Sequence, residues 1–448
     1  MRLTRLDKIA LTLAATLAAL ILIAVQVGNP FGLQVFLPER EIGIWGPLTV
    51  EFSAPVRAEA AQIGTAIQPT VPGVWVVAAP NRLDFHPAAP LEAGINYQVV
   101  IQPAELGQGG EKLQNTAQLA FSVRSPAILY MPNGEGAREI WRVQQSGEYT
   151  VQLTHSGGLV FDFHARRDGS AIAYSARNEG GGFDLWTIDR SGENAQRLLD
   201  CGLDRCTNPR WSPDGRLLAY TRENVGPNGS GLGAPRAWVI DLQANQTRQV
   251  YSDSQIIGYG PSWSPDGSRL AIYDAVTDGV RVLELASGQE TILPTATGQF
   301  GGWSPDGSQM FYTAIEDEGQ GPRSVVKLAN FATGEVTTLL SSGTFDAFYN
   351  VPAWAPDGRY IALGMRPEDG KTASSIWIVT LAMLGGPMIP GQPDATDGFY
   401  SWDAAGTKLV FQRTPLKGQY QPAILLYDMD TGLVQPLVSN AAWPQWIP

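Results

Sequence analysis

One five-residue motif recurs along the second half of this chain and constrains its fold more than any other feature. Trp263-Ser-Pro-Asp-Gly267 returns as Trp211 to Gly215 and Trp303 to Gly307 and, with one change, as Trp354 to Gly358. Intervals of about 40 to 52 residues are typical of propellers and solenoids, in which a supersecondary unit recurs because no unit buries its apolar face alone. The unequal intervals predict a constant frame with loops of variable length.

Each residue of the motif suits a hairpin turn that follows an inner strand. Tryptophan supplies a large packing surface, proline presets φ, aspartate bonds nearby backbone and glycine accepts positive φ. An apolar run such as Leu270 to Tyr273 follows the turns, as expected for the second strand of a hairpin. Because the aspartate recurs from unit to unit, we predict a bond to its own turn rather than a catalytic or calcium site. These aspartates are Asp214, Asp266, Asp306 and Asp357.

The repeat count predicts an all-β ring over residues 127–448. Inner strands are expected to start at Phe163 and at five tryptophans, and one more tryptophan, Trp446, starts a unit that lacks its other strands. Residues 127–153 have the character of those strands, so we predict that the C-terminal strand joins them and closes the ring. A seven-bladed propeller results, and six blades with loosely attached ends is the alternative. The repeat tryptophans are Trp211, Trp263, Trp303, Trp354, Trp402 and Trp446.

The motif series with its following apolar strands resembles the TolB-type β-propeller, which is also found in prolyl oligopeptidase-like enzymes. The resemblance covers about residues 127 to 448. It departs from TolB proteins before the propeller, where no α/β domain is predicted. A prolyl oligopeptidase-like activity would require a nucleophile elbow, and the sequence has no Gly-x-Ser-x-Gly. Because the chain also ends with the propeller, we expect no hydrolase domain.

The start of the chain predicts a membrane anchor. Residues 9–27 carry no charge, and their length is close to the roughly 20 apolar residues of a membrane-spanning helix. Three basic residues precede them against one acid, so the positive-inside rule places residues 1–8 in the cytoplasm and the bulk of the chain outside it. A cleaved signal peptide is the alternative, although its apolar core is usually only about 7–15 residues long. Residues 28–40 are then a linker.

Short alternating strands between clusters of Pro, Gly and Asn predict a β-sandwich over residues 41–125. Four segments resemble bacterial Ig-like domains of surface-layer and other cell-surface proteins: Thr49 to Val56, Leu83 to Pro87, Pro90 to Gly94 and Tyr97 to Ile101. In those families the module is usually a spacer or an adhesion unit. The cysteine pair and central tryptophan of antibody-type domains are absent.

Two cysteines, Cys201 and Cys206, lie close together in the sequence. Outside the cytoplasm a local disulfide is the expected state. A metal site would need further ligands, so neither a metal nor a cofactor is predicted. His155 and His164 are candidates to approach each other across a loop, but a satisfied or exposed histidine is the more common role. The net charge of −12 argues against a nucleic-acid partner.

The propeller face opposite the motif turns is the predicted binding face. The loops between second and third strands and the connections between blades gather there, and variable loops on a rigid frame usually carry recognition. Aromatic residues cluster just before the inner strands, which is typical of interfaces, and aromatic side chains that merely plug the channel are the alternative. The candidate binding residues are Tyr259, Phe300, Phe345, Phe348, Tyr349, Phe399 and Tyr400.

Together these features predict a membrane-anchored, extracytoplasmic and non-catalytic protein that binds or scaffolds a protein, peptide or glycan through its propeller face. The competing class is a hydrolase or lyase that acts on cell-surface polysaccharide in the propeller channel, an expectation based on fold analogy alone. A purely structural envelope spacer is the third class. No residue is assigned a catalytic role.

Overall fold

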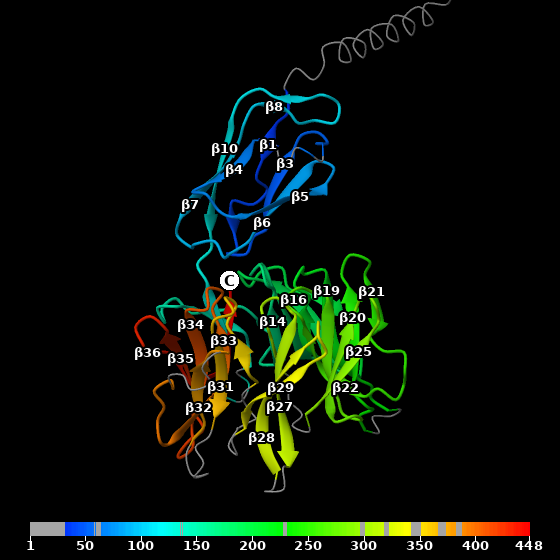
Figure 1. Cartoon of the computed structure of the whole chain (residues 1–448), viewed down its shortest axis with the longest axis vertical. Coiled ribbons are helices and arrows are strands. Elements are labelled where there is room, and N and C mark those ends of the chain that lie inside the picture. Colours follow the sequence, from blue (N-terminus) through cyan, green and yellow to red (C-terminus); the bar gives the residue numbers. More distant parts are fainter. Residues whose placement is uncertain are drawn as a thin grey trace, which may run out of the picture. The chain divides into compact units, whose positions relative to one another are not determined.

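A computed structural model describes residues 32–57, 59, 64–134, 136, 138–226, 231–295, 301–317, 322–341, 351–365, 373–381 and 388–448. The predicted anchor at residues 9–27 lies outside these ranges. Within them, no helix is long and apolar enough to cross a membrane, and the named elements are all β-strands. The chain divides into two compact units, one ending at Arg124 and the other starting at Ser125 (Figure 1).

The first unit consists of two four-stranded sheets and a small hairpin. Its strands are β1 (Val35–Phe36), β2 (Glu41–Ile42), β3 (Leu48–Phe52), β4 (Thr65–Gln68), β5 (Gly73–Ala79), β6 (Arg82–Pro87), β7 (Asn96–Ile101), β8 (Ala104–Glu105), β9 (Lys112–Leu113) and β10 (Ala117–Val123). The sheets have the orders β1-β3-β6-β5 and β2-β10-β7-β4, and β8 pairs with β9. β3 alternates buried and half-buried residues, as expected for a strand with one face on a core. Part of the segment predicted to be linker forms β1.

The second unit is a series of antiparallel sheets built from consecutive strands. The first strands are β11 (Ala127–Pro132), β12 (Trp141–Gln144), β13 (Val151–Gln152), β14 (Val160–Ala165), β15 (Ala171–Arg177), β16 (Phe183–Asp189), β17 (Gln196–Leu199), β18 (Arg205–Trp211), β19 (Leu217–Glu223), β20 (Arg236–Asp241) and β21 (Gln246–Gln249). β14 to β17 and β18 to β21 pair among themselves, and one parallel residue pair, Phe183 with Arg205, joins the two sets.

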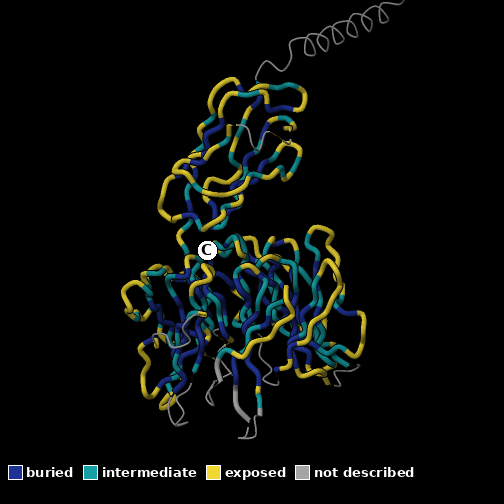
Figure 2. Tube along the Cα trace, viewed as in Figure 1, coloured by how far each residue is buried: buried dark blue, intermediate teal, exposed yellow. Residues whose placement is uncertain are grey.

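The later strands repeat this arrangement. They are β22 (Gly258–Trp263), β23 (Arg269–Asp274), β24 (Gly279–Glu284), β25 (Glu290–Pro294), β26 (Gly302–Trp303), β27 (Gln309–Asp317), β28 (Pro322–Asn330), β29 (Val336–Ser341), β30 (Ala353–Trp354), β31 (Ile361–Met365), β32 (Ser375–Val379), β33 (Ala395–Trp402), β34 (Lys408–Pro415), β35 (Ala423–Asp428), β36 (Val434–Ser439) and β37 (Ala441–Ile447). β22 to β25, β26 to β29, β30 to β32 and β33 to β36 form one sheet each. Figure 2 shows buried residues along the strands and exposed residues at many turns.

The C-terminal strand closes the series, as the sequence predicts. β37 runs antiparallel to β11, with Ala127 opposite Ile447 and Ile128 opposite Trp446. The resulting sheet has the order β13-β12-β11-β37, so it draws strands from both ends of the unit. Its pairing satisfies backbone groups that two free sheet edges would leave open.

The motif turns are held by their own side chains. Asp214 accepts hydrogen bonds from Ser212 Oγ at 2.6 Å and from Arg216 N at 3.0 Å, and Asp306 accepts the equivalent bonds from Ser304 Oγ at 2.6 Å and Ser308 N at 3.0 Å. Asp266 and Asp357 accept the corresponding backbone bond. The aspartates therefore serve their own hairpins.

Three of the repeat tryptophans tie neighbouring sheets together, while Trp354 Nε1 donates to Gly358 O of its own turn. The indole Nε1 of Trp263 donates to Arg210 O at 3.0 Å, and that of Trp402 donates to Ala353 O at 3.0 Å. Trp303 Nε1 reaches Ser262 Oγ at 3.2 Å. In each pair the acceptor residue directly precedes the tryptophan of the preceding sheet. The repeat thus fixes the spacing between successive inner strands.

Candidate functional site

The inner strands of the second unit surround a cavity of about 1000 Å³. Side chains from β14, β18, β22, β30, β33 and β37 line it, together with Met131 and Arg138 near the start of the unit. The residue directly before Phe163, and the one before five of the motif tryptophans, reaches the cavity. These residues are Asp162, Arg210, Ser262, Ala353, Ser401 and Gln445.

Irregular backbone brings further side chains to the cavity. Asn208, Phe399 and Trp443 line it, with positive φ angles of 55°, 48° and 54°. Each lies three residues before a motif tryptophan, where the strand pairing is interrupted by a bulge or irregularity. A positive φ is an outlier for a bulky side chain and costs about 1–3 kcal/mol. The same conformation recurs at Gly260, with a φ of 61°, so the bulge belongs to the repeat, and its effect is to bring the rings of Phe399 and Trp443 to the cavity. A cavity with aromatic walls and a few polar groups is the candidate binding site.

Asp162 on β14 is the carboxylate of the cavity wall. Ser175 Oγ donates a short hydrogen bond to one of its oxygens, and Asn208 N donates to the other at 2.7 Å. Burial raises the pKa of Asp162, while these donors and the charges of Arg210 and Arg138 favour its ionised form. Both oxygens have partners within the protein, and the carboxylate joins β14 to the irregular part of β18.

His164, two residues further along β14, is a neutral imidazole that accepts a backbone hydrogen bond. The backbone N–H of Trp211 donates to His164 Nδ1 at 3.3 Å. Because Nδ1 accepts, the ring proton lies on Nε2. Burial, aided by the nearby positive charge of Arg210, lowers the pKa of His164 to about 3. The imidazole is therefore uncharged at neutral pH.

Two guanidinium groups reach the cavity. That of Arg138 lies over the rings of Phe161 and Trp443, at 5.4 and 5.1 Å from the ring centroids, and Arg210 Nη1 donates to Pro209 O at 2.8 Å. Burial lowers the pKa of Arg210, an effect that the charge of Asp162 opposes. Among the residues described, neither arginine forms an ion pair with a carboxylate. The lining thus holds two cations and one carboxylate.

The predicted aromatic residues have different positions. Phe399 and Tyr400 line the cavity, and the Tyr400 hydroxyl donates to Ala362 O at 3.2 Å, so Tyr400 is a fixed part of the wall. Tyr259 packs against Tyr273 with ring centroids 5.2 Å apart and is not one of the lining residues. The other four candidates lie outside the described ranges: Phe300, Phe345, Phe348 and Tyr349.

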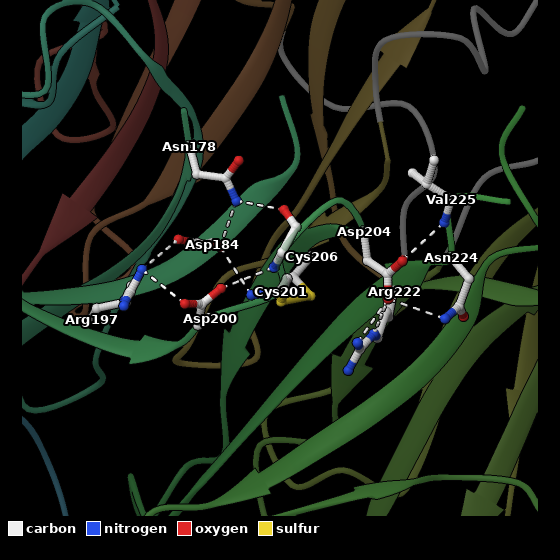
Figure 3. Close-up of a disulfide and its surroundings, with 11 residues drawn as sticks. Asn178, Asp184, Arg197, Asp200, Cys201, Asp204, Cys206, Arg222, Asn224 and Val225 are labelled. Atoms are coloured by element: carbon white, nitrogen blue, oxygen red, sulfur yellow. Dashed lines mark hydrogen bonds and ion pairs between the residues drawn. A yellow bond between two sulfur atoms is a disulfide. The ribbon is translucent and has the colours of Figure 1, made fainter. Parts of the chain in front are cut away.

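The predicted disulfide joins Cys201 and Cys206, with an S–S distance of 2.01 Å. It clamps the connection from β17 to β18, and hydrogen-bonded carboxylates surround it (Figure 3). Asp184 accepts from Cys201 N at 2.9 Å, and Asp204 accepts from Arg222 Nε at 2.8 Å. Because β18 continues to Arg210, this clamp supports one wall of the cavity.

The histidines do not form a common site. His164 lines the central cavity, whereas His155 lines a separate one of about 340 Å³. Within the described ranges, no three His, Cys, Asp or Glu side chains are grouped so that they could hold a metal ion.

Sequence reasoning found two wall residues, Phe399 and Tyr400, but missed the charged ones. Asp162, Arg210 and Arg138 come from separate parts of the chain. A signal was present for the first two, because the residue before Phe163 and before five of the motif tryptophans lines the cavity. Arg138 lies outside that register and carries no equivalent signal.

Comparison with known proteins gives partial matches. No family model matches the chain. Over 176 residues the chain is 24% identical to the uncharacterized peptidase YuxL of Bacillus subtilis, which covers 39% of this chain and 24% of the relative. Over 96 residues it is 31% identical to the Tol-Pal system protein TolB of Alcanivorax borkumensis, which covers 21% of this chain and 20% of that protein. The matches therefore span only about a quarter and a fifth of these relatives.

A solved structure shows the same fold. The puromycin-hydrolyzing peptidase of Mycobacterium tuberculosis has a TM-score of 0.52 and 14% identity, with 92% of this chain and 57% of that chain covered. At this identity the likeness concerns the fold alone. With the motif series, the sheets and the matched TolB segment, it makes the C-terminal unit a β-propeller similar to that of TolB proteins.

Proposed function

We propose that this chain is an extracytoplasmic, non-catalytic binding or scaffold protein, anchored to the membrane by residues 9–27, whose propeller binds a protein, peptide or glycan. The observation that carries the proposal is the central cavity of about 1000 Å³, lined by the strained residues Phe399 and Trp443. A well-formed cavity with aromatic walls and a few convergent polar groups is the default binding site of a protein.

The strand pairing supports a count of seven blades. Six sheets follow one another from β14 to β36, if the two joined sets are counted separately, and β37 completes a further sheet with β11 to β13. The two four-stranded sheets of the first unit support the Ig-like sandwich over residues 41–125, which would separate the propeller from the anchor. The disulfide supports an extracytoplasmic location because such bonds persist in oxidising compartments.

Binding by the full chain, kept in a mild detergent, can be measured on immobilised peptide and glycan arrays. We expect Phe399→Ala and Trp443→Ala each to weaken the binding of the retained ligands about tenfold or more, because each removes an aromatic side chain from the cavity wall. Tyr420→Ala is the matched control, since this tyrosine is 58% exposed and is not a cavity residue. Unchanged binding by both cavity variants would contradict the proposed site, and no saturable ligand on either array would favour a structural spacer.

A hydrolase is the second candidate, because the chain is similar to YuxL and to a peptidase structure. Asp162 and His164 would be the acid–base groups of such an enzyme, because both line the cavity and have shifted pKa values. Turnover of peptide or polysaccharide substrates by the full chain that is lost in His164→Asn, with folding unchanged, would replace the binding proposal.

A further inference from the structure

The two cavity arginines outnumber the carboxylates of the described lining, in which Asp162 is near both but forms an ion pair with neither. Neither Arg138 nor Arg210 has an ion pair with a carboxylate among the described residues, although the chain as a whole carries a net charge of −12. Both arginines are half-buried, and arginine stays protonated in proteins, so the lining keeps a net positive charge. An anionic ligand would balance that charge on binding.

One terminal nitrogen of Arg138 remains for such a ligand. The guanidinium lies against the rings of Phe161 and Trp443. Nη2 donates to Phe161 O, and Nε is buried with no hydrogen-bond partner in the described part of the chain. Nη1 can therefore donate a charge-assisted hydrogen bond to a carboxylate oxygen.

The other polar groups of the wall already have partners within the protein. Ser262 Oγ accepts from Trp303 Nε1 at 3.2 Å, Gln445 Oε1 accepts from Ala165 N at 3.1 Å, and the oxygens of Asp162 are both bonded. The groups that remain for a ligand include the donors of Arg138 and Arg210 and one acceptor, the amide oxygen of Asn208. A neutral glycan, which needs many donors and acceptors along its hydroxyls, would find few of them here.

The remaining wall is apolar. Met131, Val351, Pro352, Phe399 and Trp443 line the cavity together with further aromatic rings. Such a wall suits apolar side chains rather than hydroxylated sugar rings. A ligand that fits both parts of the cavity combines a carboxylate with apolar side chains, which is a property of acidic peptide segments.

We propose that the cavity binds an acidic peptide segment, with its carboxylate held by Arg138 and Arg210 and its apolar side chains against Phe399 and Trp443. This inference rests on the proposed binding function and names the ligand class of the same site. The carboxylate is that of an aspartate or glutamate side chain or of the peptide C-terminus.

The test is a selection from random heptapeptides by the full chain in mild detergent, with one pool amidated and the other free at the C-terminus. We expect the peptides selected from the amidated pool to be enriched in Asp and Glu and to carry apolar residues. If peptides are retained from the free pool and none from the amidated pool, the cavity binds the C-terminal carboxylate. That result also supports the proposal. Arg138→Gln and Arg210→Gln should each weaken the best peptide about 10- to 100-fold, as expected for a lost hydrogen bond to a charged group.

Two controls keep the result independent of folding. Arg248→Gln removes an exposed arginine of β21 and should leave binding unchanged. A second control changes the peptide and needs no protein variant. Replacing each Asp or Glu of the best peptide by Asn or Gln should weaken its binding to the wild-type chain at least tenfold.

The possible failures are distinguishable. Selected peptides without enrichment in acids, or neutral analogues that bind equally well, would overturn the acidic-peptide proposal and leave the cavity as a binding site. Retention of galacturonate oligomers with no peptide retained would also overturn it in favour of an acidic glycan. If no peptide or oligosaccharide is retained at all, both this proposal and the binding of peptides or glycans by the cavity fail.

Discussion

The motif turns and the cavity-lining positions of the propeller's inner strands differ in how their sequence repeats. In the turns, the same Ser, Asp and Gly residues recur and form the same hydrogen bonds from sheet to sheet, as at Asp214 and Asp306. At the cavity-lining positions just before those turns, equivalent positions hold different residues, among them Asp162, Arg210 and Gln445. A group required by every hairpin recurs, whereas a group that serves one ligand has no reason to recur. The turns are therefore the frame, and the cavity lining is where function is expected.

The largest expected effect of pH on folding stability comes from a cavity residue, His164. The pKa of His164 is lowered to about 3, chiefly by burial, against an ordinary value of about 6.5. A lowered histidine pKa means that the unfolded chain binds the proton first, so stability is present above about pH 6.5 and is lost as the pH falls towards 3. The full shift corresponds to at most about 5 kcal/mol.

His164→Asn tests this response, because asparagine Oδ1 can still accept from Trp211 N. The difference in free energy of unfolding between wild type and variant, measured by urea titration from pH 7 to pH 4, should shrink or reverse with falling pH. His155→Asn, at an exposed histidine, is the matched control for the loss of one imidazole. If the free energies of unfolding of wild type and variant change in parallel with pH, His164 is not the group that causes the loss of stability.

A second prediction concerns a glycine in a motif turn, Gly307, which does not line the cavity. Gly307 has a φ of 72°, and an added Cβ would lie 2.5 Å from Asp266 Oδ1 in the neighbouring turn. Gly307→Ala should therefore lower the free energy of unfolding by about 2–3 kcal/mol, from backbone strain together with displacement of Asp266.

Gly334→Ala separates the two causes. Gly334 has a similar φ of 74°, but nothing lies within 4 Å of the added Cβ, so only the strain of about 1 kcal/mol is expected. Urea titration at neutral pH measures both variants. Equal losses at the two glycines would refute the close packing of successive turns, and a loss of ligand binding in Gly307→Ala would refute the separation of frame and site.

A third, smaller effect concerns backbone strain at the cavity. Phe399 has a φ of 48°, a conformation that glycine adopts readily and alanine does not. Phe399→Gly should be more stable than Phe399→Ala by about 1 kcal/mol, while both lose ligand binding equally because both lack the ring. Thermal unfolding and the array measurement would show this. An alanine variant as stable as the glycine variant would mean that the strain is absent in solution.

The predictability of the molecule follows the same division. Repetition made the frame predictable: the Asp306 turn and the pairing of Trp446 with the first strand of the unit were predicted and are present. The disulfide was predicted from the closeness of the two cysteines in the sequence and is also present. The site was predictable only at Phe399 and Tyr400. Its charges come from separate sheets, as at Arg138 and Arg210, which line one cavity only once the sheets have packed, and a repeat pattern carries no information about residues that occur once.

The smallest predicted effect is at a turn aspartate and completes the contrast with His164. Hydrogen bonds, first from Ser304 Oγ and then from Ser308, lower the pKa of Asp306. A lowered carboxylate pKa gives stability that is present above its ordinary value of about 3.9 and is lost as the pH falls through the folded value. Because Asp306 is exposed, water screens the effect to a few tenths of a kcal/mol.

Asp306→Asn, compared with wild type by urea titration from pH 5 to pH 2, should therefore change the slope only below about pH 4, and should leave the binding of every ligand intact. The window lies below most of that of His164, so the two groups are separable in a single pH series. An effect of Asp306→Asn on binding, or one above 1 kcal/mol on stability, would mean that the motif aspartates do more than hold their turns, and the inference that repetition marks the frame would fail at its most repeated residue.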